Sequence, residues 1–215
     1  MIVAIDGPAG AGKSTVARTL AAELGFRYLD TGAMYRALTW LAIARGLPLE
    51  DGERLAALAE ENPVSFDESG RVWIAGIDVT TAIREGSVDR LVPVVARHPT
   101  VRAVMRRRQR ELTEAGNAVV EGRDIGTVVA PDADVKVYLV ADREIRARRR
   151  MAERAGIGAE ALATDLRLRD ESDAARMQPA HDAEVIDTTE LDVEDVVGWI
   201  HELVLRQSAA RRPAP

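Results

Sequence analysis

The residues best suited to chemistry form one glycine-rich stretch near the amino end of the chain. Its sequence, Gly7-Pro8-Ala9-Gly10-Ala11-Gly12-Lys13-Ser14-Thr15, fits the phosphate-binding P-loop pattern G-x-x-x-x-G-K-S. Glycine permits backbone angles that turn successive N–H groups inward, where they can bind phosphate oxygens. Lys13 can then reach the β- and γ-phosphates of a nucleotide, and the Ser14 hydroxyl can ligate Mg²⁺. The stretch therefore predicts a nucleotide site that uses magnesium.

The elements on either side of the loop are those that the motif needs. Residues 2–5, Ile-Val-Ala-Ile, are typical of a buried parallel strand. Val16, Leu20 and Leu24 recur at helical spacing and predict a helix that ends near Gly25. The alternative, a glycine-rich turn that contains a lysine by chance, would need neither element.

Two further motifs place arginines where a second anion could bind. Thr31 can cap a helix that carries Tyr35 and Arg36 one turn later. A solvated arginine beside a core-edge tyrosine would give the same pattern. The segment 121–124, Glu-Gly-Arg-Asp, follows an apolar strand, and the carboxyl ends of such strands carry the ligand sites of α/β sheets. The alternative for Arg123 is an ordinary ion pair in a turn.

Helices predicted at about 142–154 and 159–174 are rich in arginine. Each carries charges on one face: Arg146, Arg149 and Arg150 on the first, and Arg169, Asp173 and Arg176 on the second. A solvated stripe of salt bridges is the alternative for both faces. Arg102 lies near the start of another predicted helix, 99–115, whose remaining arginines suit surface charge.

Composition narrows the class of protein. The chain has 215 residues, of which 47% are hydrophobic, which suits a soluble globular protein. Its net charge of −6 argues against nucleic acid as the main partner. The absence of cysteine excludes disulfides and thiolate metal sites and fits a reducing cytoplasm. No signal peptide or membrane span is evident, so we expect a cytoplasmic protein without a membrane partner, acting as a monomer.

Alternating strands and helices predict the α/β class, with a doubly wound parallel sheet that places the P-loop after its first strand. We expect a single domain over 1–207, with an antiparallel insert at about 63–90. The arginine-rich helices, about 142–176, should form a lid over the strand ends. Residues 208–215 are small, basic and proline-rich, and we expect them to be disordered.

Together these motifs resemble the bacterial cytidylate kinases of the nucleoside monophosphate kinase group. The resemblance extends from Ile2 to about Leu205 and rests on segments in the expected order: 5–13, 29–36, 121–129, 131–133 and 169–176. Residues 122–129, Gly-Arg-Asp-Ile-Gly-Thr-Val-Val, are far more specific than the P-loop. On this resemblance, the single domain is a P-loop kinase and the insert its monophosphate-binding subdomain.

The resemblance implies transfer of the ATP γ-phosphoryl group to CMP, and also to dCMP, with Mg²⁺ as cofactor. The implied catalytic residues are Lys13, Arg123, Arg169 and Arg176. The implied ATP-binding residues are Gly7, Pro8, Ala9, Gly10, Ala11, Gly12, Lys13, Ser14 and Thr15, with Arg149 and Arg150 of the lid, and Ser14 as metal ligand. The CMP phosphate would be held by Arg36, Arg123, Arg169 and Arg176, the ribose by Asp173, and the cytosine by Arg102 and Asp124, with Thr31 and Tyr35 lining the pocket.

One position departs from the family pattern. Pro93 stands where the family usually has a serine that contacts the base, about nine residues before Arg102. Proline has no side-chain donor, so that contact is lost or passes to the backbone or to water. Alternative functions are a kinase of the same fold acting on UMP, AMP, shikimate or gluconate, a GTPase-like switch and an inactive nucleotide binder. Lysine occurs only at Lys13 and Lys136, which leaves no N/T-K-x-D guanine motif, and an intact Lys13 argues against an inactive protein.

Overall fold

The computed structural model describes residues 1–67, 69–153, 164, 166–167, 170–171 and 177–211. The chain divides into two compact units, one made of Met1–Tyr28 with Gly116–Pro215 and the other of Leu29–Ala115. Most of the second predicted arginine-rich helix lies outside the described residues.

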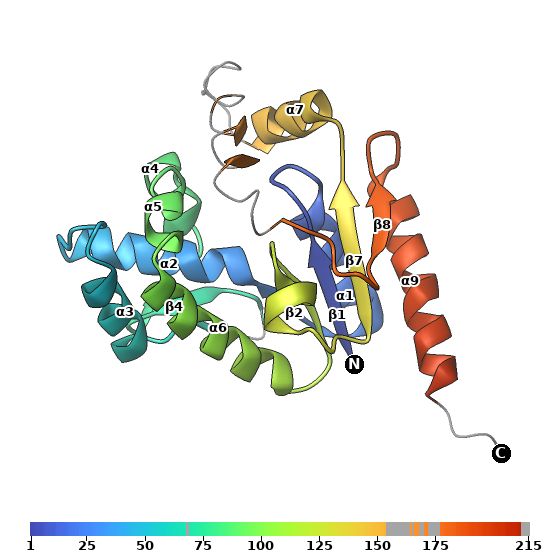
Figure 1. Cartoon of the computed structure of the whole chain (residues 1–215), viewed down its shortest axis with the longest axis horizontal. Coiled ribbons are helices and arrows are strands. Elements are labelled where there is room, and N and C mark those ends of the chain that lie inside the picture. The colour runs from blue at the N-terminus through green and yellow to red at the C-terminus, as the bar shows by residue number, and fades with distance from the viewer. Residues whose placement is uncertain (68, 154–163, 165, 168–169, 172–176, 212–215) are drawn as a thin grey trace. The chain divides into compact units, whose positions relative to one another are not determined.

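The first unit is built on a five-stranded sheet in the order β2-β6-β1-β7-β8. Its strands are β1 (Ile2–Asp6), β2 (Arg27–Asp30), β6 (Ala118–Glu121), β7 (Val135–Val140) and β8 (Glu184–Asp187). β1 pairs in parallel with both β6 and β7, and β7 pairs in parallel with β8. The predicted parallel sheet, with the P-loop after its first strand, is therefore confirmed (Figure 1).

Two helices pack together against this sheet. α1 (Lys13–Leu24) packs on β6 and α9 (Val193–Ala210) on β7, and the two helices also contact each other. Apolar side chains between helices and sheet, such as Leu20, Leu139 and Ile200, are buried completely. This core fixes the strands whose carboxyl ends carry the P-loop and α7 (Arg143–Glu153).

The last helix is longer than the sequence predicts. The Asp192 side chain caps this helix by accepting from Asp195 N at 2.9 Å. The Asp195 carboxylate in turn accepts from the backbone N–H of Asp192. The helix ends at Ala210, so the predicted disordered tail is wrong for residues 208–210. Ser208 Oγ donates to Val204 O at 2.8 Å, and alanine favours the helix strongly enough to extend it here.

The second unit combines helices with a small antiparallel sheet. Its elements are α2 (Thr31–Ala44), α3 (Gly52–Glu61), β3 (Ser65–Phe66), β4 (Val72–Ile74), β5 (Ile77–Asp78), a 3₁₀ turn (Ala82–Arg84), α4 (Gly86–Asp89), α5 (Val92–Ala96) and α6 (Pro99–Glu114). β4 pairs antiparallel with β3 on one side and β5 on the other, as predicted for the insert. The antiparallel insert is therefore confirmed as a three-stranded sheet.

This unit has its own core. α2 packs on β4, and α3 packs along α6. Met34, Leu38 and Leu55 are almost completely buried, and Ile83 of the 3₁₀ turn joins the same cluster. The turn that carries Arg84 is therefore anchored to α2 by apolar packing. In the parts of the chain that the structure describes, no helix is long and apolar enough to cross a membrane.

Candidate functional site

The P-loop joins β1 to α1 in a conformation that requires glycine. Gly7 has φ +145°, and a Cβ at this position would lie 2.2 Å from Leu139 O on β7. Gly12 has φ +89° and precedes α1 without a side-chain cap. A helix start without a capping side chain leaves its first N–H groups for other acceptors, and its dipole favours anions. The loop therefore has the backbone geometry of a phosphate site.

Three consecutive carbonyl groups of this loop accept hydrogen bonds from three different cations. The bonds run from Arg123 Nη1 to Gly7 O (2.9 Å), from Lys13 Nζ to Pro8 O (2.7 Å) and from Arg146 Nη1 to Ala9 O (3.1 Å). The two arginines follow β6 and β7, the strands that flank β1. Positive charge is thus gathered at the loop, which is the electrostatic complement of a polyphosphate.

Ser14 is joined to a buried carboxylate. Its Oγ donates to Glu121 Oε2 at 2.9 Å, and Tyr28 Oη donates to the other carboxylate oxygen. Glu121 ends β6 beside Ile5, which explains its closeness to the loop. Hydroxyl and carboxylate oxygens are the donors that Mg²⁺ prefers, and it usually completes its shell with water and phosphate. Among the described residues no three histidine, cysteine or acidic side chains form a metal-binding group of their own.

A second buried carboxylate fixes the turn after Arg123. Asp6 accepts from Ile125 N at 2.8 Å and from Gly126 N at 2.7 Å. Burial raises the pKa of Asp6 to about 6, although these two N–H groups act in the opposite direction. Asp124 precedes the π-helical turn Ile125–Val129, so Asp6 holds the first two N–H groups of that turn.

The arginines of α7 are placed by contacts within the first unit. Arg146 forms a fork with Asp170 at 3.2 and 2.8 Å and is buried. Arg149 donates to Thr188 Oγ1 at 2.9 Å and to Thr188 O at 2.6 Å, beside β8. Arg150 lies one residue further along the same helix. The remaining predicted lid residues, Arg169, Asp173 and Arg176, lie outside the described residues.

The other predicted site residues belong to the second unit. Thr31, Tyr35 and Arg36 lie in the first turns of α2, and Arg102 lies in the first turn of α6. The predicted cap, Thr31, is wrong: Asp30 caps α2, because its carboxylate accepts from Ala33 N and Thr31 is already the first helical residue. Asp30 also binds Arg36 through both carboxylate oxygens.

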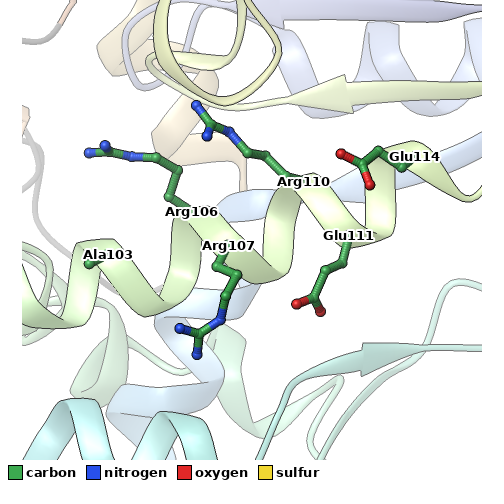
Figure 2. A pocket seen from close by; sticks show the side chains of 6 residues that line it. All are labelled: Ala103, Arg106, Arg107, Arg110, Glu111 and Glu114. Atoms are coloured by element: carbon green, nitrogen blue, oxygen red, sulfur yellow. The ribbon is translucent and has the colours of Figure 1, made fainter.

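A cavity of about 370 Å³ lies along α6 and contains none of the predicted site residues. It is lined by Ala103, Arg106, Arg107, Arg110, Glu111 and Glu114 (Figure 2). Arg107 pairs with Glu60 at 3.0 Å, and the side chains leave α6 in several directions. Mixed charge of this kind is typical of a solvated helix face, in line with the expectation of surface charge for these arginines.

The sequence motifs found the loop and placed Arg146 on a charged helix face, but they gave no role to Asp6, Glu121, Asp170 or Thr188. Glu121, Asp6 and Arg146 are buried charges with long-range partners. Asp170 and Thr188 are the partners that position the α7 arginines. Only the place of Asp6 and Glu121 at strand ends could have indicated them.

Comparisons with known proteins show the family of the chain. The family model for cytidylate kinase matches residues 3–206. The cytidylate kinase of Shouchella clausii (strain KSM-K16) is 48% identical over 217 residues, which cover 96% of each chain. A bifunctional pantoate ligase/cytidylate kinase of Synechococcus sp. (strain JA-3-3Ab) is 46% identical over 226 residues, which cover 97% of this chain and 42% of that longer protein. A shikimate kinase of Bacteroides thetaiotaomicron shares the fold, with TM-score 0.53 and 16% identity over 95% of this chain and 98% of its own.

Proposed function

Because this chain belongs to the cytidylate kinase family, we propose that it transfers the γ-phosphoryl group of ATP to CMP, and also to dCMP. The products are ADP and CDP or dCDP. The observation that carries the proposal is the P-loop whose carbonyl groups hold Lys13, Arg123 and Arg146. The attacking phosphate oxygen is already an anion, so positioned cations rather than a strong base must supply the catalysis.

ATP would bind through its phosphates to the backbone N–H groups of the loop. Lys13 would bind the β- and γ-phosphates, and Arg149 and Arg150 would bind ATP from α7. Ser14 would ligate Mg²⁺, and its bond to Glu121 holds the hydroxyl in place for that task. When bound, the metal neutralises charge on the phosphates. The oxygen donors of Ser14 and Glu121 fit this ion.

CMP would bind through a different set of side chains. We assign its phosphate to Arg36 and Arg123 as forked guanidinium donors. Arg102 and Asp124 would read the base, because an aspartate can accept from the cytosine amino group, which uracil lacks. Thr31 and Tyr35 would line the pocket. The resemblance alone supports phosphate contacts from Arg169 and Arg176 and a ribose contact from Asp173.

We also assign the α7 segment and the residues after it, about 142–176, to a lid. Closure of a lid excludes water, which would otherwise accept the phosphoryl group from ATP. The contact of Arg146 with Ala9 O supports this assignment, because it ties α7 to the P-loop. We further propose that the protein is cytoplasmic, which its cysteine-free sequence supports. We also propose that it is a monomer, which light scattering would test.

A panel of acceptors tests the function. ADP release is measured with ATP and Mg²⁺ while CMP, dCMP, UMP, AMP, dTMP, shikimate or gluconate is supplied at equal concentration. We expect CMP and dCMP to give the highest kcat/KM, with shikimate, gluconate, AMP and dTMP lower by about a hundredfold or more. The Lys13→Ala variant controls for contaminating kinases. High turnover of another acceptor, with CMP inert, would overturn the proposal.

A further inference from the structure

The amino end of α2 carries a buried carboxylate that holds two guanidinium groups. Asp30 Oδ1 accepts from Ala33 N at 2.8 Å and so caps the helix. Arg36 Nη2 donates to both oxygens of Asp30, at 3.0 and 2.8 Å. Arg84 Nη2 donates to Asp30 Oδ2 at 2.7 Å from the 3₁₀ turn, 54 residues further along the chain. Two cations from separate elements therefore share one anion.

The carboxylate engages only part of the donor capacity of these arginines. A guanidinium carries five N–H groups, and each arginine here uses only Nη2 on Asp30. Within the described residues, Arg36 Nε is buried without an acceptor. Both arginines therefore keep N–H donors that Asp30 does not engage.

Charge and exposure at this cluster favour an incoming anion over a cation. Asp30 is 6% exposed, whereas the Arg84 side chain is 46% exposed. Burial would raise the pKa of Asp30, but the two guanidinium groups and the Ala33 amide hold it below its ordinary value. One fixed negative charge thus faces two positive ones at a helix start, where the dipole adds further positive potential.

The backbone on each side of the pair holds the two arginines in place. A Cβ at position 32 would lie 3.2 Å from Asp30 Oδ1 and 3.2 Å from Arg36 Nη1, so Gly32 lets the guanidinium lie close to the helix. Ile83, next to Arg84, is fully buried in the core of this unit. The backbone that presents Arg84 is therefore anchored, although the end of its side chain is exposed.

We propose that Arg84 is a second phosphate-binding arginine of the acceptor site, set beside Arg36 by Asp30. The identity of the ligand as a nucleoside monophosphate rests on the proposed function. Two forked guanidinium groups that share one carboxylate can each bind a different oxygen of the same phosphate dianion. Arg84 touches the phosphate, whereas Asp30 acts through the two arginines and is a positioning residue.

Steady-state kinetics with Arg84→Ala and Arg84→Lys test the proposal. Loss of one charge-assisted contact should raise the KM for CMP about tenfold, which is about 1.4 kcal/mol, with the KM for ATP unchanged. Arg84→Lys should recover part of the loss, because it keeps the charge without the fork. The matched control is Arg54→Ala, since Arg54 also pairs with a helix-capping aspartate, Asp51, at 3.5 Å, and its side chain is 69% exposed.

Asp30→Asn tests the positioning role. The amide keeps an acceptor for Ala33 N but loses the charge that holds both arginines. We expect its KM for CMP to rise at least as much as that of Arg84→Ala, with a smaller change in kcat. The wild-type KM should fall as pH rises through about 6, where the phosphate gains its second charge. Arg84→Ala and Asp30→Asn should each make the KM for CMP less dependent on pH. A purely structural role for these residues would not change that dependence.

An independent titration separates this proposal from the proposed function. Inorganic phosphate and CMP are each added to the full chain, and the ¹⁵N–H resonance of Arg84 Nε, assigned by its loss in Arg84→Lys, is followed. Shifts that saturate with either probe support the phosphate contact even if CMP is not a substrate. No shift with either probe, an unchanged KM for CMP, or equal rises in both KM values with a lower Tm would overturn it.

Discussion

Asp6 offers the most quantitative test of how the first unit is held together. Its carboxylate accepts two backbone N–H groups of the turn Ile125–Val129, and the residue is 6% exposed at the end of β1. Burial raises its pKa from the ordinary 3.8 to about 6. The unfolded chain therefore ionises Asp6 at a lower pH than the folded chain does.

The sign and size of the effect follow from proton linkage. The pKa of Asp6 is higher in the folded state than in the unfolded state. The stabilisation that the protonated carboxyl group contributes is therefore complete below pH 3.8 and is lost as the pH rises through about 6. At 1.36 kcal/mol for each pKa unit, the full loss is about 3 kcal/mol. About 1 kcal/mol of this loss of stability should occur between pH 5 and pH 7.

The assay is chemical denaturation of wild type and Asp6→Asn at pH 5, 6 and 7. Asparagine cannot ionise, yet it keeps one acceptor oxygen for the turn. The difference in free energy of unfolding, variant minus wild type, should grow by about 1 kcal/mol from pH 5 to pH 7, since other titrating groups cancel. Asp132→Asn, at an exposed position, is the control. A difference that stays constant or shrinks with pH would refute the reasoning.

Three further substitutions test the P-loop and its partners. Arg123→Ala should lower CMP turnover about tenfold or more with little change in the KM for ATP, and normal CMP turnover would remove Arg123 from the site. Glu121→Gln keeps an oxygen for Ser14 but loses the charge, so half-maximal activity should need several-fold more Mg²⁺; an unchanged titration contradicts its link to the metal. Gly7→Ala would place a Cβ 2.2 Å from Leu139 O, and we expect about 3 kcal/mol or more of destabilisation by denaturant. A loss below about 1 kcal/mol would show that the close approach can relax.

Local patterns were enough to predict the parts of the fold that depend on neighbouring residues. β1, the P-loop and α1 follow from an apolar run, glycine spacing and helical periodicity, and the structure confirms all three. The antiparallel insert follows in the same way from alternation around turns. These features depend on interactions within about 20 residues, which the sequence displays directly.

Long-range pairing could not be predicted from such patterns. Ser14 meets Glu121 only because β6 lies beside β1, 107 residues away in sequence. Arg84 likewise sits in a short 3₁₀ turn without periodicity, and its partner Asp30 lies in a different element. The roles given to Arg169, Asp173 and Arg176 stay predictions.

Strand order explains why cations reach the P-loop from both sides. β1 lies between β6 and β7, so the segments that follow these two strands end on either side of the loop. Arg123 arrives after β6 and Arg146 after β7, and each binds a different loop carbonyl. A carbonyl acceptor fixes the position of a guanidinium without cancelling its charge, whereas the fork with Asp170 also offsets the charge of Arg146. Arginines anchored in this way are positioned before a phosphate arrives, so less reorganisation opposes transfer than if they had to be ordered during the reaction.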